Sequence, residues 1–311
     1  MTRRITLLLA VLLLAISCVP AAAPGSSASP GARATLPSAS FPASVTDFQG
    51  RSVAIAKRPE RIVSIGPSNT EFLFALGAGE RIVGDDDFSD QPAAAKTKEH
   101  VGGVKVSLEK VVSLKPDLVV TVKFSDGTIE ALSQTSAAVL VVDPQNLADV
   151  ARTATILGRA VGADGAKLAD DIQKRIDAVR AKTATAPKPK VFHEIDASDL
   201  SKLFTVGPGS FIDDLIAVAG GTNIAAGAKT QYPTISTEEI VRADPQVVVL
   251  ADAAYGTTVE SVASRPGWSA LAAVRSKRVY PVAGDLFSRP GPRVGEAAEA
   301  YAKLLHPELF P

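Results

Sequence analysis

The sequence predicts an α/β protein of two similar lobes, each with a central parallel β-sheet, joined by one long α-helix. Short runs of β-branched residues alternate with longer stretches of helical periodicity along most of the chain. A segment that begins at residue 107 is repeated at residue 236. Between the two copies lies a long helical pattern with one apolar and one charged face. These observations together favour two lobes and a helical connection.

The composition is that of an ordinary globular protein. The chain has 311 residues, of which 46% are hydrophobic and 21% are charged. This length allows one large domain or two of ordinary size. The 33 basic and 33 acidic residues balance, and no basic stripe is present, so nothing in the sequence points to nucleic-acid binding.

The first residues predict a bacterial lipoprotein signal peptide, residues 1–17. Arg3 and Arg4 precede an apolar run that is much shorter than the roughly 20 residues of a membrane-spanning helix. Small residues then lead to Cys18, the one cysteine of the chain, so no internal disulfide is expected. We expect lipidation of Cys18 and an extracytoplasmic protein anchored to the cell membrane.

Residues 18–57 predict a disordered tether. The stretch 19–43 is almost wholly Ala, Pro, Ser and Gly, and such a stretch cannot bury enough apolar surface to fold. The remaining boundaries follow from the positions of the predicted elements. They place the N-terminal lobe at 58–162, the interlobe helix at 163–186 and the C-terminal lobe at 187–311.

The N-terminal lobe begins with a predicted strand over 61–65. Ser68 and Glu71 have the spacing of a capping box, which predicts a helix that starts there and stops near Gly77. Strands alternating with helices imply a parallel sheet covered on both faces. The further strands of this lobe are predicted at 81–84, 117–122 and 138–142.

The repeat identifies the second lobe. Ser107 is followed by a helical segment, by Pro116 and by an aliphatic strand, and Ser236 is followed by the same pattern with Pro245. The serine and the proline are nine residues apart in both copies. A repeat of this length indicates two similar lobes rather than a solenoid, whose period is roughly 20–50 residues.

A long amphipathic helix is predicted between the lobes. Asp164 is a suitable N-cap, and Leu168, Ile172, Ile176 and Val179 recur at helical spacing. About 20 helical residues span about 30 Å. One continuous helix resists bending, so we expect a stiff connection and a small opening motion.

The motifs of common enzymes are absent from the sequence. There is no Gly-x-Ser-x-Gly elbow, phosphate-binding loop or His-Glu-x-x-His helix. The three histidines, His100, His193 and His306, are scattered, which predicts no metal site. A carboxylate-pair hydrolase stays open, although nothing singles out a pair. The sequence therefore favours a binding protein without a cofactor of its own.

Aromatic residues gather in the loops that follow predicted strands. Ligands of open α/β sheets bind beyond the carboxyl ends of the strands, and loops are normally polar. Five aromatics in such loops therefore indicate a binding face, although each could instead pack only its own loop. These five are Phe88, Phe124, Phe204, Tyr232 and the phenylalanine of the segment 285–289.

The region from about Arg58 to Phe310 resembles the ABC-importer binding proteins with a rigid interlobe helix, which carry cobalamin, siderophore-iron and haem. The resemblance rests on the motifs at 61–71, 114–119 and 285–293, and it is greatest to the cobalamin-binding members. It implies two Rossmann-like lobes with a ligand cleft between them. It also implies a monomer that is not an enzyme and that delivers its ligand to a permease dimer with ATPase subunits.

The resemblance also implies roles for single residues. Phe88, Phe204 and Tyr232 match aromatic residues that face the ligand in the cobalamin-binding members. Asp285 and Arg289 match an acid and an arginine that contact it.

Other positions depart from the family pattern or match a different surface. Gly103 and Val122 stand where the cobalamin-binding members have two tryptophans, for which Phe124 could compensate. Glu109 and Glu238, at the same register of the two repeat copies, match glutamates that dock on permease arginines.

The ligand itself stays open between related classes. Cobalamin or a related corrinoid is the first hypothesis, and a ferric siderophore or haem is the alternative. Lys123, Arg289 and Arg293 could face an anionic chelate, and Tyr232 or His193 could serve as an axial ligand to haem. A nitrogenase-like enzyme on a two-lobe scaffold would need cluster-ligating cysteines, which the predicted domain lacks.

Overall fold

The computed structural model describes residues 40–282 and 284–310. The predicted signal peptide, Cys18 and the tether up to residue 39 lie outside the described residues. In the described part of the chain, no helix has the length and apolar character needed to cross a membrane.

The N-terminal lobe contains a five-stranded parallel sheet in the order β5-β4-β3-β6-β7. The two central strands, β3 and β6, are buried along their whole length, as parallel strands covered on both faces must be. The strands are β3 (Ile62–Ile65), β4 (Ile82–Asp85), β5 (Glu99–His100), β6 (Leu118–Thr121) and β7 (Ala138–Val141). The helices of this lobe are α1 (Pro67–Ala75), α2 (Leu108–Ser113), α3 (Thr128–Ser133) and α4 (Leu147–Val161), with 3-10 turns at Gly79–Arg81 and Ala93–Thr97.

The prediction of a disordered tether up to residue 57 is wrong for residues 43–55, which form two strands. Strands β1 (Ala43–Thr46) and β2 (Ser52–Ile55) form an antiparallel hairpin that belongs to the N-terminal lobe. Val45 and Ile55 are buried in the main core, and the amide of Phe48 donates to the carbonyl of Val141 at 3.0 Å. The alternation of apolar and polar residues in these strands is enough to bury one face of the hairpin.

The expected capping box at Ser68 is also wrong. Helix α1 starts one residue after Gly66, which has a φ of 106° and provides no side-chain cap. Pro67 occupies the first turn, where its missing N–H costs nothing. A Cβ at position 66 would lie 2.6 Å from Val122, so both the backbone conformation and the packing require glycine. Glu71 is thereby free of capping and points elsewhere.

The C-terminal lobe contains a six-stranded sheet in the order β11-β9-β8-β12-β13, with β10 also paired to β8. Strands β8, β10, β12 and β13 are parallel, as expected, whereas β9 and β11 add an antiparallel edge. The strands are β8 (Lys190–Asp196), β9 (Leu203–Thr205), β10 (Thr222–Asn223), β11 (Thr234–Ile235), β12 (Val247–Leu250) and β13 (Val279–Pro281). The helices are α6 (Phe211–Val218), α7 (Thr237–Ala243), α8 (Val259–Ala263), α9 (Ala272–Arg275), α10 (Gly284–Ser288) and α11 (Val294–Leu305), with 3-10 turns at Ala253–Tyr255 and Trp268–Ala270.

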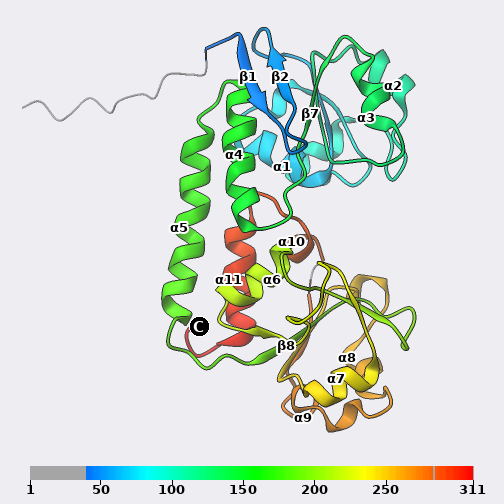
Figure 1. The fold of residues 1–311 in the computed structure, drawn as a ribbon, viewed down its shortest axis with the longest axis vertical. Helices are drawn as coiled ribbons and strands as arrows, with labels where there is room; N and C mark the ends of the chain where they lie inside the picture. The colour runs from blue at the N-terminus through cyan, green and yellow to red at the C-terminus, as the bar shows by residue number, and fades with distance from the viewer. Residues whose placement is uncertain (1–39, 283, 311) are drawn as a thin grey trace, which may run out of the picture. The chain divides into compact units, whose positions relative to one another are not determined.

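One continuous helix, α5 (Gly165–Thr183), joins the two lobes. It starts at the predicted N-cap, where the side chain of Asp164 accepts from the amide of Lys167 at 3.0 Å. Ile172, Ile176 and Val179 form its buried face. Figure 1 shows α5 running beside α4 and then beside α11, and both pairs are in extensive contact. The connection is thus a helix supported along its length by a helix of each lobe.

Candidate functional site

A cluster of charged side chains lies where the two lobes meet. From the N-terminal lobe come Glu71 on α1 and Asp90 in the loop after β4. From the C-terminal lobe come Arg289, just after α10, and Arg293, the residue before α11. Glu71 and Arg289 are nearly buried, with side chains 4% and 11% exposed. These residues are about 200 positions apart in the sequence, so only the tertiary fold brings them together.

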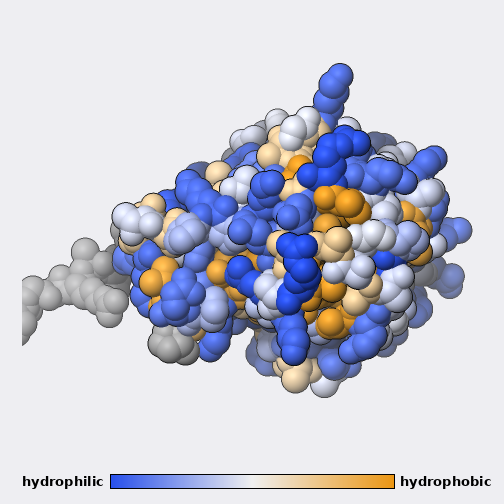
Figure 2. All heavy atoms as spheres, turned by 90° about the horizontal axis from the view of Figure 1, so that it is seen from below, coloured by the Kyte–Doolittle hydropathy of each residue, from blue (hydrophilic) through white to orange (hydrophobic). Residues whose placement is uncertain are grey.

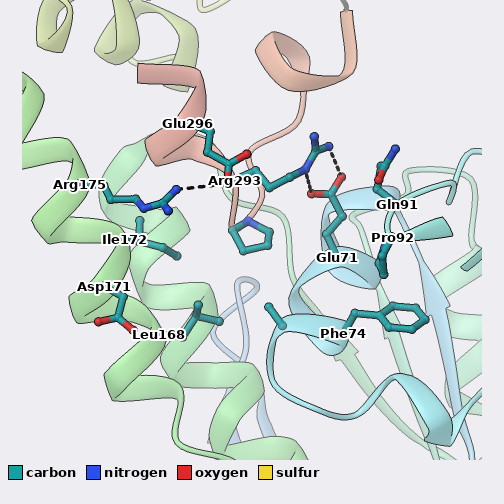
Figure 3. A pocket seen from close by; sticks show the side chains of 12 residues that line it. Glu71, Phe74, Gln91, Pro92, Leu168, Asp171, Ile172, Arg175, Arg293 and Glu296 are labelled. Carbon is teal, nitrogen blue, oxygen red and sulfur yellow. Dashed lines mark hydrogen bonds and ion pairs between the residues drawn. The ribbon is translucent and has the colours of Figure 1, made fainter. Parts of the chain in front are cut away.

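Arg293 binds Glu71 in a bidentate pair, in which Nε and Nη2 each donate to a carboxylate oxygen at 2.8 Å. This geometry is the strong form of an ion pair, because two charge-assisted hydrogen bonds fix one relative orientation. The pair raises the pKa of the Arg293 guanidinium. Figure 3 shows the two side chains pointing toward each other from α1 and the start of α11.

Arg289 has several partners at once. Its Nη1 lies 2.6 Å from Asp90 and 3.4 Å from Glu71. Its Nη2 lies 3.0 Å from Asp285 and 3.2 Å from the carbonyl oxygen of Phe88. The structure therefore brings together three of the predicted ligand residues, Phe88, Asp285 and Arg289. It also adds Glu71, which its spacing from Ser68 assigned to a helix cap, and Asp90, which nothing in the sequence marks as a site residue.

The loop that carries Phe88 is fixed by Asp86. This buried carboxylate accepts from the amide of Gly66 at 2.6 Å, from the amide of Phe88 at 2.9 Å and from the hydroxyl of Ser89 at 3.0 Å. The Phe88 ring leans over Gly103, where a Cβ would lie 3.2 Å from the ring. A tryptophan at position 103 would therefore occupy the space that Phe88 takes.

Three of the predicted aromatic residues remain exposed. Phe88 is 51% exposed, and Phe204 and Tyr232 are each 41% exposed. The face seen in Figure 2 is mainly hydrophilic, with apolar residues in small separate groups. Single exposed rings are common on protein surfaces, so exposure alone does not identify a binding face. Phe124 differs, because it is half-buried and packs against a core cluster of the N-terminal lobe.

The two repeat glutamates lie at equivalent places in the two lobes. Ser107 caps α2 and Ser236 caps α7, and each side chain accepts from the amide three residues on. Glu109 and Glu238 lie in the first turns of these helices and are exposed. The fold thus presents one exposed carboxylate per lobe at the same helical position.

Comparison with known proteins gives the family. The sequence profile described as periplasmic binding protein matches residues 62–285. The chain belongs to the periplasmic binding protein family. An ABC transporter substrate-binding lipoprotein of Bacillus subtilis, YvrC, is 35% identical over 282 residues, which cover 87% of each chain.

Two solved structures share the fold of this binding protein. The periplasmic vitamin B12 binding protein BtuF of Vibrio cholerae has a TM-score of 0.69 and 26% identity, with 80% of this chain and 97% of that chain covered. The periplasmic heme-binding protein RhuT of Roseiflexus has a TM-score of 0.69 and 25% identity, with 80% and 99% covered.

A cavity of about 520 Å³ adjoins the charged cluster of the binding protein (Figure 3). Its wall contains Glu71 and Phe74 from α1, Ile172 and Arg175 from α5, and Arg293. Of the residues that the sequence analysis offers for the ligand, Arg293 lines it. The cavity lies on the α5 side of the Glu71–Arg293 pair.

His193 cannot serve as an axial ligand to haem from its place in β8. It is fully buried, and its Nδ1 lies 2.7 Å from the hydroxyl of Tyr301. Burial lowers the pKa of His193 to about 3. No cluster of three or more metal-ligating His, Cys, Asp or Glu residues occurs within residues 40–282 and 284–310.

We predict that His193 makes folding sensitive to mild acid. Its pKa is about 3 in the folded protein, whereas an unfolded chain has a histidine pKa of about 6.5. As the pH falls below about 6.5, only the unfolded state takes up this proton, so stability is lost. The linkage lowers the free energy of unfolding by about 2 kcal/mol between pH 7 and pH 5.

Urea denaturation at both pH values measures this loss. The His193→Gln variant should lose about 2 kcal/mol less than the wild type over the same interval. Tyr301→Phe is the control, because it removes the hydrogen bond but keeps the imidazole and its pH dependence. The same pH dependence in wild type and His193→Gln would show that this histidine titrates normally.

Proposed function

We propose that this periplasmic binding protein captures cobalamin or a related corrinoid between its lobes and delivers it to an ABC importer. The vitamin B12 binding protein and the heme-binding protein that share its fold support a tetrapyrrole-like ligand. The charge balance around Arg289 is the observation that favours a corrinoid over the alternatives.

The cluster around Arg289 carries no surplus of positive charge. Two arginines, Arg289 and Arg293, face three carboxylates, those of Glu71, Asp90 and Asp285. An anionic ferric chelate would need unpaired cations in the cleft, because complementary charge governs such recognition. A corrinoid instead presents a rim of neutral amides, which need acceptors such as Asp285 as well as donors such as Arg289.

Haem fits the described residues less well. Although Tyr232 is 41% exposed, partial desolvation of its phenol raises the pKa of this group, and the carboxylate of Asp143 adds to this shift. Both effects disfavour the phenolate that would bind iron. His193, the other candidate, is buried away from solvent behind Tyr301. Neither Tyr232 nor His193 is therefore well suited to bind haem iron as an axial ligand.

The exposed aromatics suit the broad faces of a macrocycle. Rings such as Phe88, Phe204 and Tyr232 lose little entropy on binding, and each well-placed aromatic pair contributes about 0.5–1.5 kcal/mol beyond its buried area. Phe124, half-buried at the edge of the N-terminal core, would add a smaller surface. We keep these four residues, with Asp285 and Arg289, as the proposed ligand site.

The remaining parts of the proposal concern location and partners. The lipoprotein name of the Bacillus relative supports an extracytoplasmic protein held at the membrane through Cys18. A diacyl group supplies the two chains that stable anchoring needs. We infer that the protein acts as a monomer, without catalysis, and docks on a permease dimer through Glu109 and Glu238.

We predict that purified protein binds cyanocobalamin more tightly than hemin or a ferric siderophore in a spectroscopic titration. Tyr232→Ala should weaken cyanocobalamin binding about tenfold, since it removes one aromatic contact of about 1.4 kcal/mol. Tyr255→Ala is the matched control, because Tyr255 is 92% exposed and lies outside the proposed site. Tighter binding of hemin or siderophore, or wild-type affinity in Tyr232→Ala, would refute the corrinoid site.

We predict that Glu109→Arg combined with Glu238→Arg abolishes stimulation of the importer's ATPase while ligand affinity stays near wild type. Rim charges mainly set orientation and association rate, so each single reversal should have a milder effect. The competing explanation is that first-turn glutamates only favour the helix dipole, by about 0.3–1 kcal/mol.

The control for docking is a second double reversal, Glu130→Arg with Glu260→Arg. These glutamates also lie exposed in first helical turns, one on α3 and one on α8. The helix-dipole explanation requires equal effects in the two double variants. Normal ATPase stimulation in the Glu109 and Glu238 variant would reject the docking role.

A further inference from the structure

The charged cluster divides into two parts with different exposure. The Glu71–Arg293 pair is bidentate, and its carboxylate is only 4% exposed. The Asp90–Arg289 pair has one contact at 2.6 Å, and its carboxylate is 34% exposed. Both pairs join an N-terminal carboxylate to a C-terminal arginine, so both resist separation of the lobes at this point.

The two terminal nitrogens of Arg289 already have four partners within the protein, three through hydrogen bonds and one through an ion pair. Nη1 faces Asp90 and Glu71, and Nη2 faces Asp285 and the carbonyl of Phe88. A ligand oxygen can therefore bind the end of this guanidinium only by replacing one of these partners. Asp90 is the most replaceable carboxylate from the other lobe, because it is partly exposed and water can take the place of Arg289.

Glu71 is a poor candidate for replacement. It accepts two charge-assisted hydrogen bonds from Arg293 in addition to its longer contact with Arg289. Removing Arg293 would leave the nearly buried Glu71 carboxylate without its bidentate partner, which is strongly unfavourable. Gly291 packs against the same carboxylate, since a Cβ there would lie 3.3 Å from Glu71. The Glu71–Arg293 contact is therefore the constant part of the cluster.

We propose that Glu71, Asp90 and Arg293 are positioning residues for ligand capture, in which Glu71–Arg293 is a permanent clasp between the lobes and Asp90 is exchanged for a ligand oxygen on Arg289. The clasp sets the separation of the lobes in the ligand-free protein. Asp90 holds Arg289 at the cleft until the ligand arrives. The exchange step rests on the proposed function, whereas the clasp does not.

Asp90 and Glu71 both contact Arg289, yet removal of their charges should change ligand affinity in opposite directions. Asp90 competes with the ligand for Arg289. Loss of its charge therefore makes the ligand-free state less stable, and the ligand binds more tightly. Loss of the Glu71 charge frees the lobes, so binding must pay for ordering them and weakens. A purely structural cluster would give effects of the same sign.

The clasp is tested by the distance between two spin labels, at Ser113→Cys in the N-terminal lobe and Ser269→Cys in the C-terminal lobe. Both positions are exposed, and a Cys18→Ser background leaves no other thiol. In the ligand-free full chain, Glu71→Gln should broaden the distance distribution and shift it to longer values. Arg293→Lys keeps the charge without the bidentate geometry and should give an intermediate distribution.

Glu296→Gln is the matched control for the clasp. Glu296 lines the same cavity and pairs with Arg175 at 3.1 Å, but both side chains are at least half exposed. Its distance distribution should equal that of the wild type. A wild-type distribution in both Glu71→Gln and Arg293→Lys would overturn the clasp, whatever the ligand is.

The exchange is tested by titration with cyanocobalamin. Asp90→Asn should bind about fivefold more tightly than wild type, and Glu71→Gln about fivefold more weakly. The exchange would be overturned if both variants changed the affinity for cyanocobalamin in the same direction, or if Asp90→Asn left it unchanged. If the wild type binds no cyanocobalamin, the proposed function and the exchange both fail, and the distance measurement still decides the clasp.

Discussion

The carboxylate of Glu71 accepts two hydrogen bonds from Arg293 and faces Arg289 as well, and the arrangement of the cleft depends on this contact. It comes from the first turns of α1 and meets the segment that leads into α11. Without it, Arg289 would lose the most buried of its three carboxylate partners. The cost of burying these charges is offset because every charge in the cluster has an opposite neighbour.

The helices beside this contact restrict what the lobes can do. Helix α5 packs on α4 in one lobe and on α11 in the other, and α11 begins directly after Arg293. The interlobe helix and the ion pairs therefore hold the same element. We expect such a frame to favour a small opening, in line with the exchange of a single hydrogen-bond partner. This fits a protein that must release its ligand to a permease without large rearrangement.

Local patterns in the sequence were enough for much of the fold. The N-caps at Ser107, Ser236 and Asp164 follow from side chains that bond within their own turn, so spacing alone predicts them. The capping box at Ser68 failed because Gly66 and Pro67 start the helix earlier. The hairpin containing Val45 and Ile55 was missed because its strands are short and follow a stretch rich in Ala, Pro and Ser.

The charged cluster could be predicted only in part. The family resemblance identifies Arg289 and Asp285, whereas the spacing of Ser68 and Glu71 predicts a helix cap and no local pattern marks Asp90. Periodicity reports only neighbours along the chain, whereas Glu71 and Arg293 are 222 positions apart.

The most direct test is a crystal structure with cyanocobalamin. The account predicts a corrin ring against Phe88 and Tyr232, a ligand oxygen in place of Asp90 on Arg289, and an intact Glu71–Arg293 pair. A corrinoid bound outside the cleft, or Arg289 still paired with Asp90, would contradict it.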